Sequence, residues 1–77
     1  MKEFIEYIAK QLVDHPESVI VDERIDEDKK LLLTIRVSQS DTGKVIGKQG
    51  RTAAAMRILL TAVAAKHGKR AGLEILD

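Results

Sequence analysis

The chain has 77 residues, a net charge of +1 and no cysteine, and 44% of its residues are hydrophobic. This length predicts a single domain over residues 1–77, and the lack of cysteine excludes disulfide bonds and thiolate metal sites. No apolar run approaches the roughly 20 residues of a membrane-spanning helix, and Met1–Val13 does not resemble a signal peptide. We therefore expect a soluble, cytoplasmic protein.

The charge is divided unequally between the two halves of the chain. Residues 1–40 carry 6 Lys and Arg against 9 Asp and Glu, whereas residues 41–77 carry 7 against 3. The halves thus have net charges of −3 and +4. Such an asymmetry predicts an anionic partner for the basic half, although chance alone can also divide surface charge in this way.

The first predicted element is an amphipathic helix that ends before Pro16. Four apolar residues recur at helical spacing, and polar residues occupy much of the rest of the circle. The apolar residues are Phe4, Ile5, Ile8 and Leu12. Pro16 limits the helix because the residue before a proline avoids the helical conformation.

Two strands joined by a charged turn follow the first helix. Residues 18–25 are rich in Val and Ile, residues 26–30 form the turn, and residues 31–37 alternate in polarity. The side chains of the second strand that share one apolar face are Leu31, Leu33, Ile35 and Val37. The two strands are expected to pair as a β-hairpin.

The second half of the chain predicts a short helix, a glycine loop, a long helix and a last strand. The short helix is expected to begin at Ser40 or Asp41. The long helix covers residues 52–67 and stops at Gly68, and residues 73–75 suggest a short strand. The whole order predicts an α+β fold in which a three-stranded sheet is covered by helices.

The glycine loop, Gly47-Lys48-Gln49-Gly50, points to an anionic ligand. Glycine has no Cβ, so the backbone can approach an anion closely. The next helix directs its unpaired N–H groups and its positive dipole end to the same place. Lys48 and Arg51 add full charges, so the loop predicts phosphate binding, above all to a nucleic-acid backbone. A simple tight turn with a solvated tip is the alternative.

The loop and the order of elements together resemble the KH domain family. The defining motif of that family is Gly-x-x-Gly between two helices, here residues 47–50. An extra helix and strand ahead of the strand–helix–helix–strand core is similar to the bacterial, type II arrangement. The longer string Gly43–Ala53, with Arg57 and Leu59-Leu60 beyond it, is similar to small bacterial proteins made of one KH domain.

This resemblance implies binding of single-stranded RNA, with about four nucleotides held at the loop. It also implies action after transcription, as an RNA chaperone or regulator, and a link to cell elongation and envelope homeostasis. The implied partners are RNA, a second copy of the chain, and a larger KH-containing protein. The sequence holds no arrangement of nucleophile and base or of metal ligands, so we expect neither an enzyme nor a bound cofactor or metal.

The residues predicted to contact RNA surround the loop. They are Lys44, Val45, Ile46, Gly47, Lys48, Gln49, Gly50 and Arg51. The cations are assigned to phosphates, and Val45 and Ile46 to bases. The chain has one Phe and one Tyr, both in the first predicted helix, so no aromatic platform for base stacking is expected. Two to four cations predict a log–log salt slope of about −1.5 to −3.

The long helix has apolar residues on two sides. Its predicted core face consists of Ala53, Met56, Leu59, Leu60 and Val63. Its opposite side carries Ala54, Ile58, Ala62 and Ala65, which predict a two-fold interface with a second copy. Alternatively, alanine is simply a good helix former and Ile58 is an isolated exposed residue. The same face also allows a different function, that of a dimerising adaptor for a protein partner with weak RNA binding.

Overall fold

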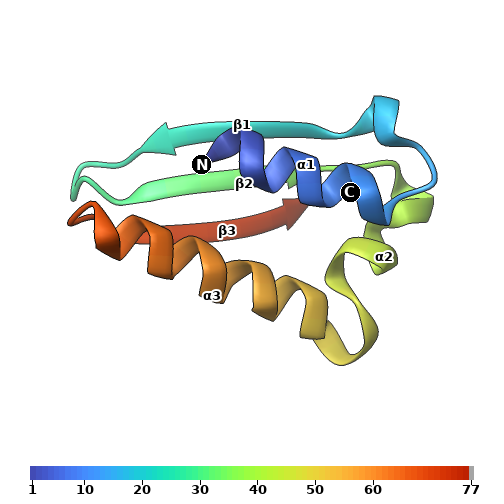
Figure 1. Ribbon diagram of the computed structural model, residues 1–77. Coiled ribbons are helices and arrows are strands. Elements are labelled where there is room, and N and C mark those ends of the chain that lie inside the picture. Colours follow the sequence, from blue (N-terminus) through green and yellow to red (C-terminus); the bar gives the residue numbers. More distant parts are fainter. Residues whose placement is uncertain (77) are drawn as a thin grey trace.

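The structure, a computed structural model, describes residues 1–76, which contain three α-helices and three strands. In chain order they are α1 (Lys2–Leu12), β1 (Ile20–Ile25), β2 (Leu31–Arg36), α2 (Thr42–Ile46), α3 (Arg51–Lys66) and β3 (Ala71–Leu76). Short 3-10 turns lie at Pro16–Ser18, Gln39–Asp41 and Lys48–Gly50. This order confirms the α+β fold predicted from the sequence (Figure 1).

The three strands form one sheet in the order β1-β2-β3, with β2 in the centre. β1 and β2 are antiparallel, with Ile20 opposite Arg36 and Ile25 opposite Leu31, which confirms the predicted hairpin. β2 and β3 are parallel, with Leu31 beside Ala71. A parallel pair needs a crossover connection, and here the crossover consists of α2, the glycine loop and α3. The predicted site, the Gly47–Gly50 loop, therefore lies within the crossover that connects β2 to β3.

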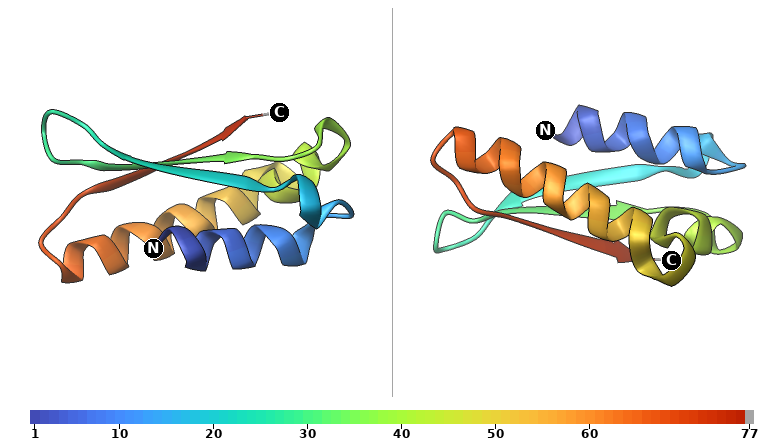
Figure 2. Two further views of the ribbon diagram at one scale, coloured as in Figure 1. Left: turned by 90° about the horizontal axis from the view of Figure 1, so that it is seen from above. Right: turned by 60° about the horizontal axis from the view of Figure 1, so that its bottom comes forward.

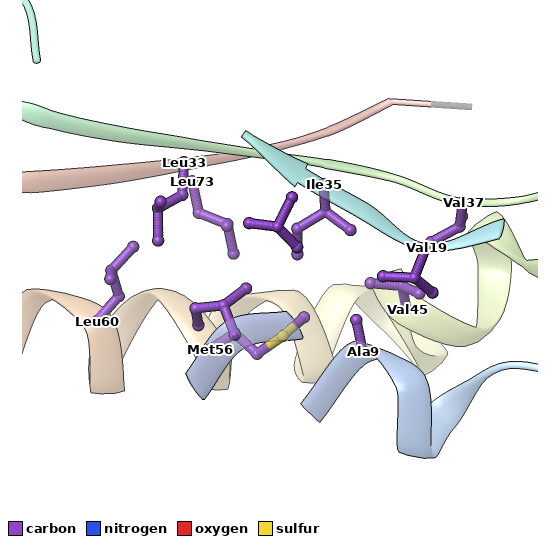
Figure 3. Close-up of a cluster of buried hydrophobic side chains, with 11 residues drawn as sticks. Ala9, Val19, Leu33, Ile35, Val37, Val45, Met56, Leu60 and Leu73 are labelled. Carbon is purple, nitrogen blue, oxygen red and sulfur yellow. The ribbon is translucent and has the colours of Figure 1, made fainter. Parts of the chain in front are cut away.

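The helices cover one face of the sheet and leave the other face open (Figure 2). Alternation in β2 explains this two-layer arrangement, because every second side chain is buried under the helices while Arg36 is exposed. The predicted inner face of this strand is confirmed: Leu31, Leu33, Ile35 and Val37 are all buried. Leu33, Ile35 and Val37 meet side chains from the helices, including Met56 and Leu60, in one apolar core (Figure 3).

Helix α1 presents only a narrow stripe to the core. Ile5 and Ala9 are fully buried, whereas Phe4, which the periodicity groups with Ile5, is 45% exposed. Successive residues are turned by about 100° around a helix, so Phe4 and Ile5 cannot both point at the sheet. The helix ends at Leu12, before Pro16, and Pro16 itself opens a 3-10 turn.

The buried face of α3 is also narrower than predicted. It consists of Ala53, Met56, Leu60 and Ala64. The prediction that Leu59 and Val63 belong to the core is wrong, because they are 46% and 37% exposed. α3 lies along the β3 side of a sheet of only three strands (Figure 1), so one row of its side chains reaches the sheet. Although it is apolar on several sides, α3 is, like the other described helices, not long and apolar enough to cross a membrane.

Candidate nucleic-acid interface

The Gly47–Gly50 loop joins α2 to α3 in a tight turn (Figure 1). Three of its four residues have a positive φ: Gly47 at +81°, Gln49 at +58° and Gly50 at +73°. The N–H of Gly50 donates a hydrogen bond to the carbonyl oxygen of Gly47 at 3.0 Å, which closes the turn. Residues with a Cβ are disfavoured in this backbone region, which accounts for the two glycines.

The two glycines are needed for different reasons. At Gly47 a Cβ atom would lie 2.8 Å from the backbone nitrogen of Thr52, so a side chain there would displace the start of α3. At Gly50 nothing lies within 4 Å of the same position. Gly47 therefore fixes the shape of the turn, and Gly50 keeps the outer surface of the turn open to a ligand.

Cationic and polar side chains surround the tip of this turn. Lys48, Gln49 and Arg51 are exposed, and Ile46 is 37% exposed beside them. Among the described residues, neither Lys48 nor Arg51 has an ion-pair partner. Both lie next to the first turn of α3, where the helix dipole adds positive potential. The tip therefore offers positive charge to an anion, and Ile46 provides apolar surface beside it.

Val45 does not belong to this surface, contrary to prediction. Its side chain is 0% exposed and points into the core among Ala9, Val19 and Val37 (Figure 3). α2 is only five residues long, and Val45 is its one buried residue. Val45 therefore anchors the helix beneath the loop, and of the predicted apolar pair only Ile46 is accessible to a ligand.

Lys44 is engaged within the protein rather than free at the loop. Its Nζ donates to Oδ2 of Asp14 at 2.5 Å and to Oδ1 of Asp41 at 3.4 Å. The hydrogen bond with Asp14 raises the pKa of Lys44, so the ammonium stays protonated. Because two carboxylates oppose its charge, Lys44 offers less attraction to a phosphate than the sequence suggests.

Asp41 is a residue whose role the sequence does not reveal. It occupies the predicted helix-capping position but makes no capping hydrogen bond, and its carboxylate is fully buried. It accepts the N–H groups of Asp14 at 3.2 Å and His15 at 3.0 Å, and lies 3.1 Å from Nδ1 of His15. Burial alone raises the pKa of Asp41, but the hydrogen bonds outweigh it and hold the pKa below its ordinary value. Asp41 thereby fastens the end of α1 to the start of α2.

The outer side of α3 has a shallow apolar hollow of about 370 Å³, lined by Arg57, Ile58, Thr61, Ala62 and Ala65. Ile58 is 69% exposed at this hollow, and Ala54 is exposed one turn earlier. Arg57 borders it and donates from Nε to the carbonyl oxygen of Leu73 at 3.3 Å, which ties α3 to β3. All four residues of the predicted interface are therefore accessible, and the exposed Leu59 and Val63 widen the apolar surface.

Comparison with known proteins gives one consistent result. A sequence profile described as the KhpA/KhpB KH domain matches residues 2–75. The chain is 48% identical to RNA-binding protein KhpA of Aquifex aeolicus over 77 residues, covering 100% of this chain and 96% of the relative. It is 50% identical to RNA-binding protein KhpA of Clostridium perfringens over 76 residues, covering 99% of this chain and 100% of the relative.

A third relative, RNA-binding protein KhpA of Borreliella burgdorferi, is 52% identical over 75 residues, covering 97% of this chain and 90% of the relative. No solved structure was found to match the chain. The relatives are named as RNA-binding proteins and not as enzymes, which confirms the prediction that the chain is not an enzyme. By profile, by identity over the full length and by the fold described above, the chain belongs to the KhpA/KhpB family of KH domains.

Proposed function

We propose that this protein binds single-stranded RNA and holds about four nucleotides at the Gly47–Gly50 loop. The observation that carries the proposal is the exposed turn itself, open at Gly50 and flanked by the exposed cations Lys48 and Arg51. RNA binding is also the property named in each of the relatives. The proposal rests on these two independent supports.

The proposed mechanism assigns a separate task to each residue of the loop. Lys48 and Arg51 attract phosphates, Gln49 offers hydrogen bonds, and Gly50 lets the sugar–phosphate chain approach the backbone. Ile46 provides apolar contact with a base. The chain's only Phe and Tyr are on α1, so base recognition in this proposal depends on hydrogen bonds and apolar contact rather than on aromatic stacking.

The proposal includes a homodimer formed through Ala54, Ile58, Ala62 and Ala65 on α3. The small side chains let two helices approach closely, and in this dimer Ile58, which lines the hollow, meets the same residue of the other copy. A dimer displays two loops, so two segments of one RNA can be held together and modest single-site affinities combine. Such bridging suits an RNA chaperone or post-transcriptional regulator, acting as a homodimer or with a KhpB-like partner and linked to cell elongation and envelope homeostasis.

A second candidate function is a dimerising adaptor that recruits a protein partner, with RNA contact incidental. One observation favours it: the exposed surface of α3 is largely apolar, since Ile58, Leu59 and Val63 are 69%, 46% and 37% exposed. Apolar surface of this kind is typical of protein interfaces. A partner bound there would leave the glycine loop unused, so the two functions separate when the loop alone is altered.

The deciding experiment replaces Lys48 and Gln49 with Asp and measures binding of short single-stranded RNA at low salt. Aspartate tolerates the left-handed conformation of residue 49, so the fold should persist while phosphate is repelled. Lys10-Gln11 on α1 is the control, because it is the same pair of residue types at exposed positions. Lys10 pairs with Glu6 at 3.0 Å, so circular dichroism must confirm that this control variant is folded. We expect the loop variant to lose binding and the control variant to keep it.

Three results would count against the proposal. Unchanged RNA binding by the folded loop variant would remove the loop from the mechanism. Equal losses in the loop variant and the Lys10-Gln11 control would show that net charge alone governs binding. Full cellular function in cells that carry only the loop variant would favour the adaptor.

A further inference from the structure

A second group of cations surrounds a cleft at the end of the molecule opposite the Gly47–Gly50 loop. The cleft has a volume of about 490 Å³ and lies between the turn that joins β1 to β2 and the link that joins α3 to β3. The polar residues that line it are Asp28, Lys29, His67, Lys69 and Arg70. Both segments lie at the same end of the ribbon, at the left of Figure 1. We refer to this feature as the distal cleft.

The backbone of both walls of the distal cleft is fixed by hydrogen bonds. In the β1–β2 turn, Oδ1 of Asp26 accepts the N–H groups of Asp28 and Lys30, each at 2.9 Å. Lys29 donates its N–H to the carbonyl oxygen of Asp26 at 3.0 Å and has a φ of +62°, rare for a residue with a Cβ. In the other wall, the carbonyl oxygen of Arg70 accepts the N–H of Leu31 at 2.8 Å. The backbone that carries the cationic side chains is thus held in place by hydrogen bonds.

The charges of the distal cleft are not neutralised within the protein. Lys29, Lys69 and Arg70 form no ion pair among residues 1–76, although Asp28 lines the same cleft. The carbonyl groups of Ala64 and Ala65 in the last turn of α3 do not need these cations, because the N–H groups of Lys69 and Gly68 already bond to them at 2.9 Å. The two walls, residues 26–30 and 67–70, together carry four Lys and Arg against three carboxylates, because Asp26 and Glu27 share the turn with Asp28. The excess positive charge therefore lies on the α3–β3 link, where Lys69 and Arg70 are open to an anion.

We propose that the distal cleft is a second phosphate-binding site for RNA, occupied by the strand whose other part is held at the Gly47–Gly50 loop. This inference rests on the proposed function, since it takes RNA as the ligand. The two sites lie at opposite ends of α3, whose 16 residues span about 24 Å. A stacked strand advances about 3.4 Å per nucleotide, so roughly seven nucleotides bridge the two sites. Short RNA then reaches the loop alone, and longer RNA reaches both.

The test compares unstructured oligoribonucleotides of about 5 nucleotides, which fill the loop, with oligoribonucleotides of about 15 nucleotides, which also reach the distal cleft. The variant replaces Lys69 and Arg70 with Gln. The control replaces Lys10 and Arg24 with Gln; these two residues are exposed elsewhere on the molecule, and their replacement removes the same charge. We expect the Lys69/Arg70 variant to lose roughly tenfold in affinity for the longer RNA at low salt and about 1.4 of its salt slope. Its affinity for the shorter RNA should not change.

The outcomes separate this inference from the proposed function. Equal salt slopes for the two RNA lengths would overturn the proposed role of the distal cleft, and so would an unchanged affinity of the Lys69/Arg70 variant for the longer RNA. Either result would leave the proposed role of the loop intact. An equal loss in the Lys10/Arg24 control would also overturn it, because net charge would then explain the effect. Loss of long-RNA binding in the Lys69/Arg70 variant, with no loss in the Lys48/Gln49 variant, would uphold the distal cleft and reject the loop.

Discussion

Gly47 and Gly50 look equivalent in the motif but differ in what surrounds them. Gly47 has a φ of +81° and a ψ of 167°, a combination essentially confined to glycine, and it also packs against Thr52. Gly50 has a φ of +73° and a ψ of 12°, which other residues adopt at moderate cost, and it faces open space. One glycine serves folding, and in the proposed mechanism the other serves ligand approach.

Replacing each glycine with alanine should therefore have a different main effect. One replacement should mainly lower stability, and the other should mainly weaken RNA binding. Gly47→Ala should lower the free energy of unfolding by about 2–4 kcal/mol, from backbone strain and overpacking together. Gly50→Ala should cost only about 1 kcal/mol and weaken RNA binding several-fold, because the new methyl group projects where the strand approaches. Urea unfolding and RNA titration of both variants would measure this. Equal stability losses would contradict the assignment.

The buried Asp41 predicts a stability that depends on pH. Its pKa is lowered in the folded protein from an ordinary value of 3.8, so the carboxylate stabilises the fold above that value and ceases to do so as pH falls through the folded pKa. Asp41→Asn replaces one acceptor oxygen with a donor facing the N–H groups of Asp14 and His15. We expect a lower melting temperature than wild type at neutral pH, and a difference that shrinks below pH 3.8.

The exposed Asp22 offers a matched control for this experiment. Asp22→Asn makes the same chemical change on the hairpin, where no hydrogen bond to the protein is lost. Its melting temperature should follow that of wild type at every pH. A gap between wild type and Asp41→Asn that stays constant through acid pH would show that the charge of Asp41 does not contribute to stability.

At the level of the elements, α3 is distinctive because so little of its surface is covered. A helix that buries one narrow row of side chains and leaves Ile58 at 69% exposure presents an apolar face to solvent. In the proposed dimer this face is covered by its own copy. Ile58 contributes nothing to the core of its own chain, so its replacement separates association from folding.

Ile58→Asp should therefore convert the proposed dimer to a folded monomer, since two like charges would meet at the two-fold axis. Sedimentation at tens of micromolar measures the mass, and circular dichroism reports the fold. Leu59→Asp is the matched control, because Leu59 is the next residue, is 46% exposed and does not line the hollow. A wild-type chain that sediments as a monomer, or equal effects of the two changes, would contradict the proposed interface.

The sequence predicts the helices and strands themselves closely, but it does not predict which residues of different elements contact one another. Alternation over residues 31–37 predicts the buried face of β2 because side-chain direction in a strand is a local property. Val45, in contrast, is buried because of how a five-residue helix sits on the sheet, which no spacing encodes. Lys44 pairs with Asp14, 30 residues away, and such a contact exists only after folding. The site was thus predictable in its backbone motif but not in which side chains remain free.

At the scale of the whole molecule, charge placement matters more than total charge. The molecule measures 35 × 21 × 17 Å and carries a net charge of +1. Two groups of exposed cations lie at the loop and at the distal cleft, near the two ends of α3. Because the screening length is about 8 Å at physiological salt, these two groups act locally and nearly independently. Affinity for RNA should accordingly follow the cations that touch phosphate.

Asp14→Asn tests this view because it changes the charge of the loop without touching the loop. In wild type, Lys44 is held by Asp14 and Asp41, so Lys48 and Arg51 alone predict a slope of about −1.4 for short RNA. Removing the Asp14 carboxylate leaves Lys44, one turn before Gly47, with only its longer contact to Asp41, and should steepen the slope towards about −2.1 and raise affinity at low salt. Asp22→Asn changes the net charge equally on the distant hairpin, and should leave both quantities unaltered. If the two variants bind short RNA alike, total charge governs binding and the restraint of Lys44 by Asp14 is irrelevant to it.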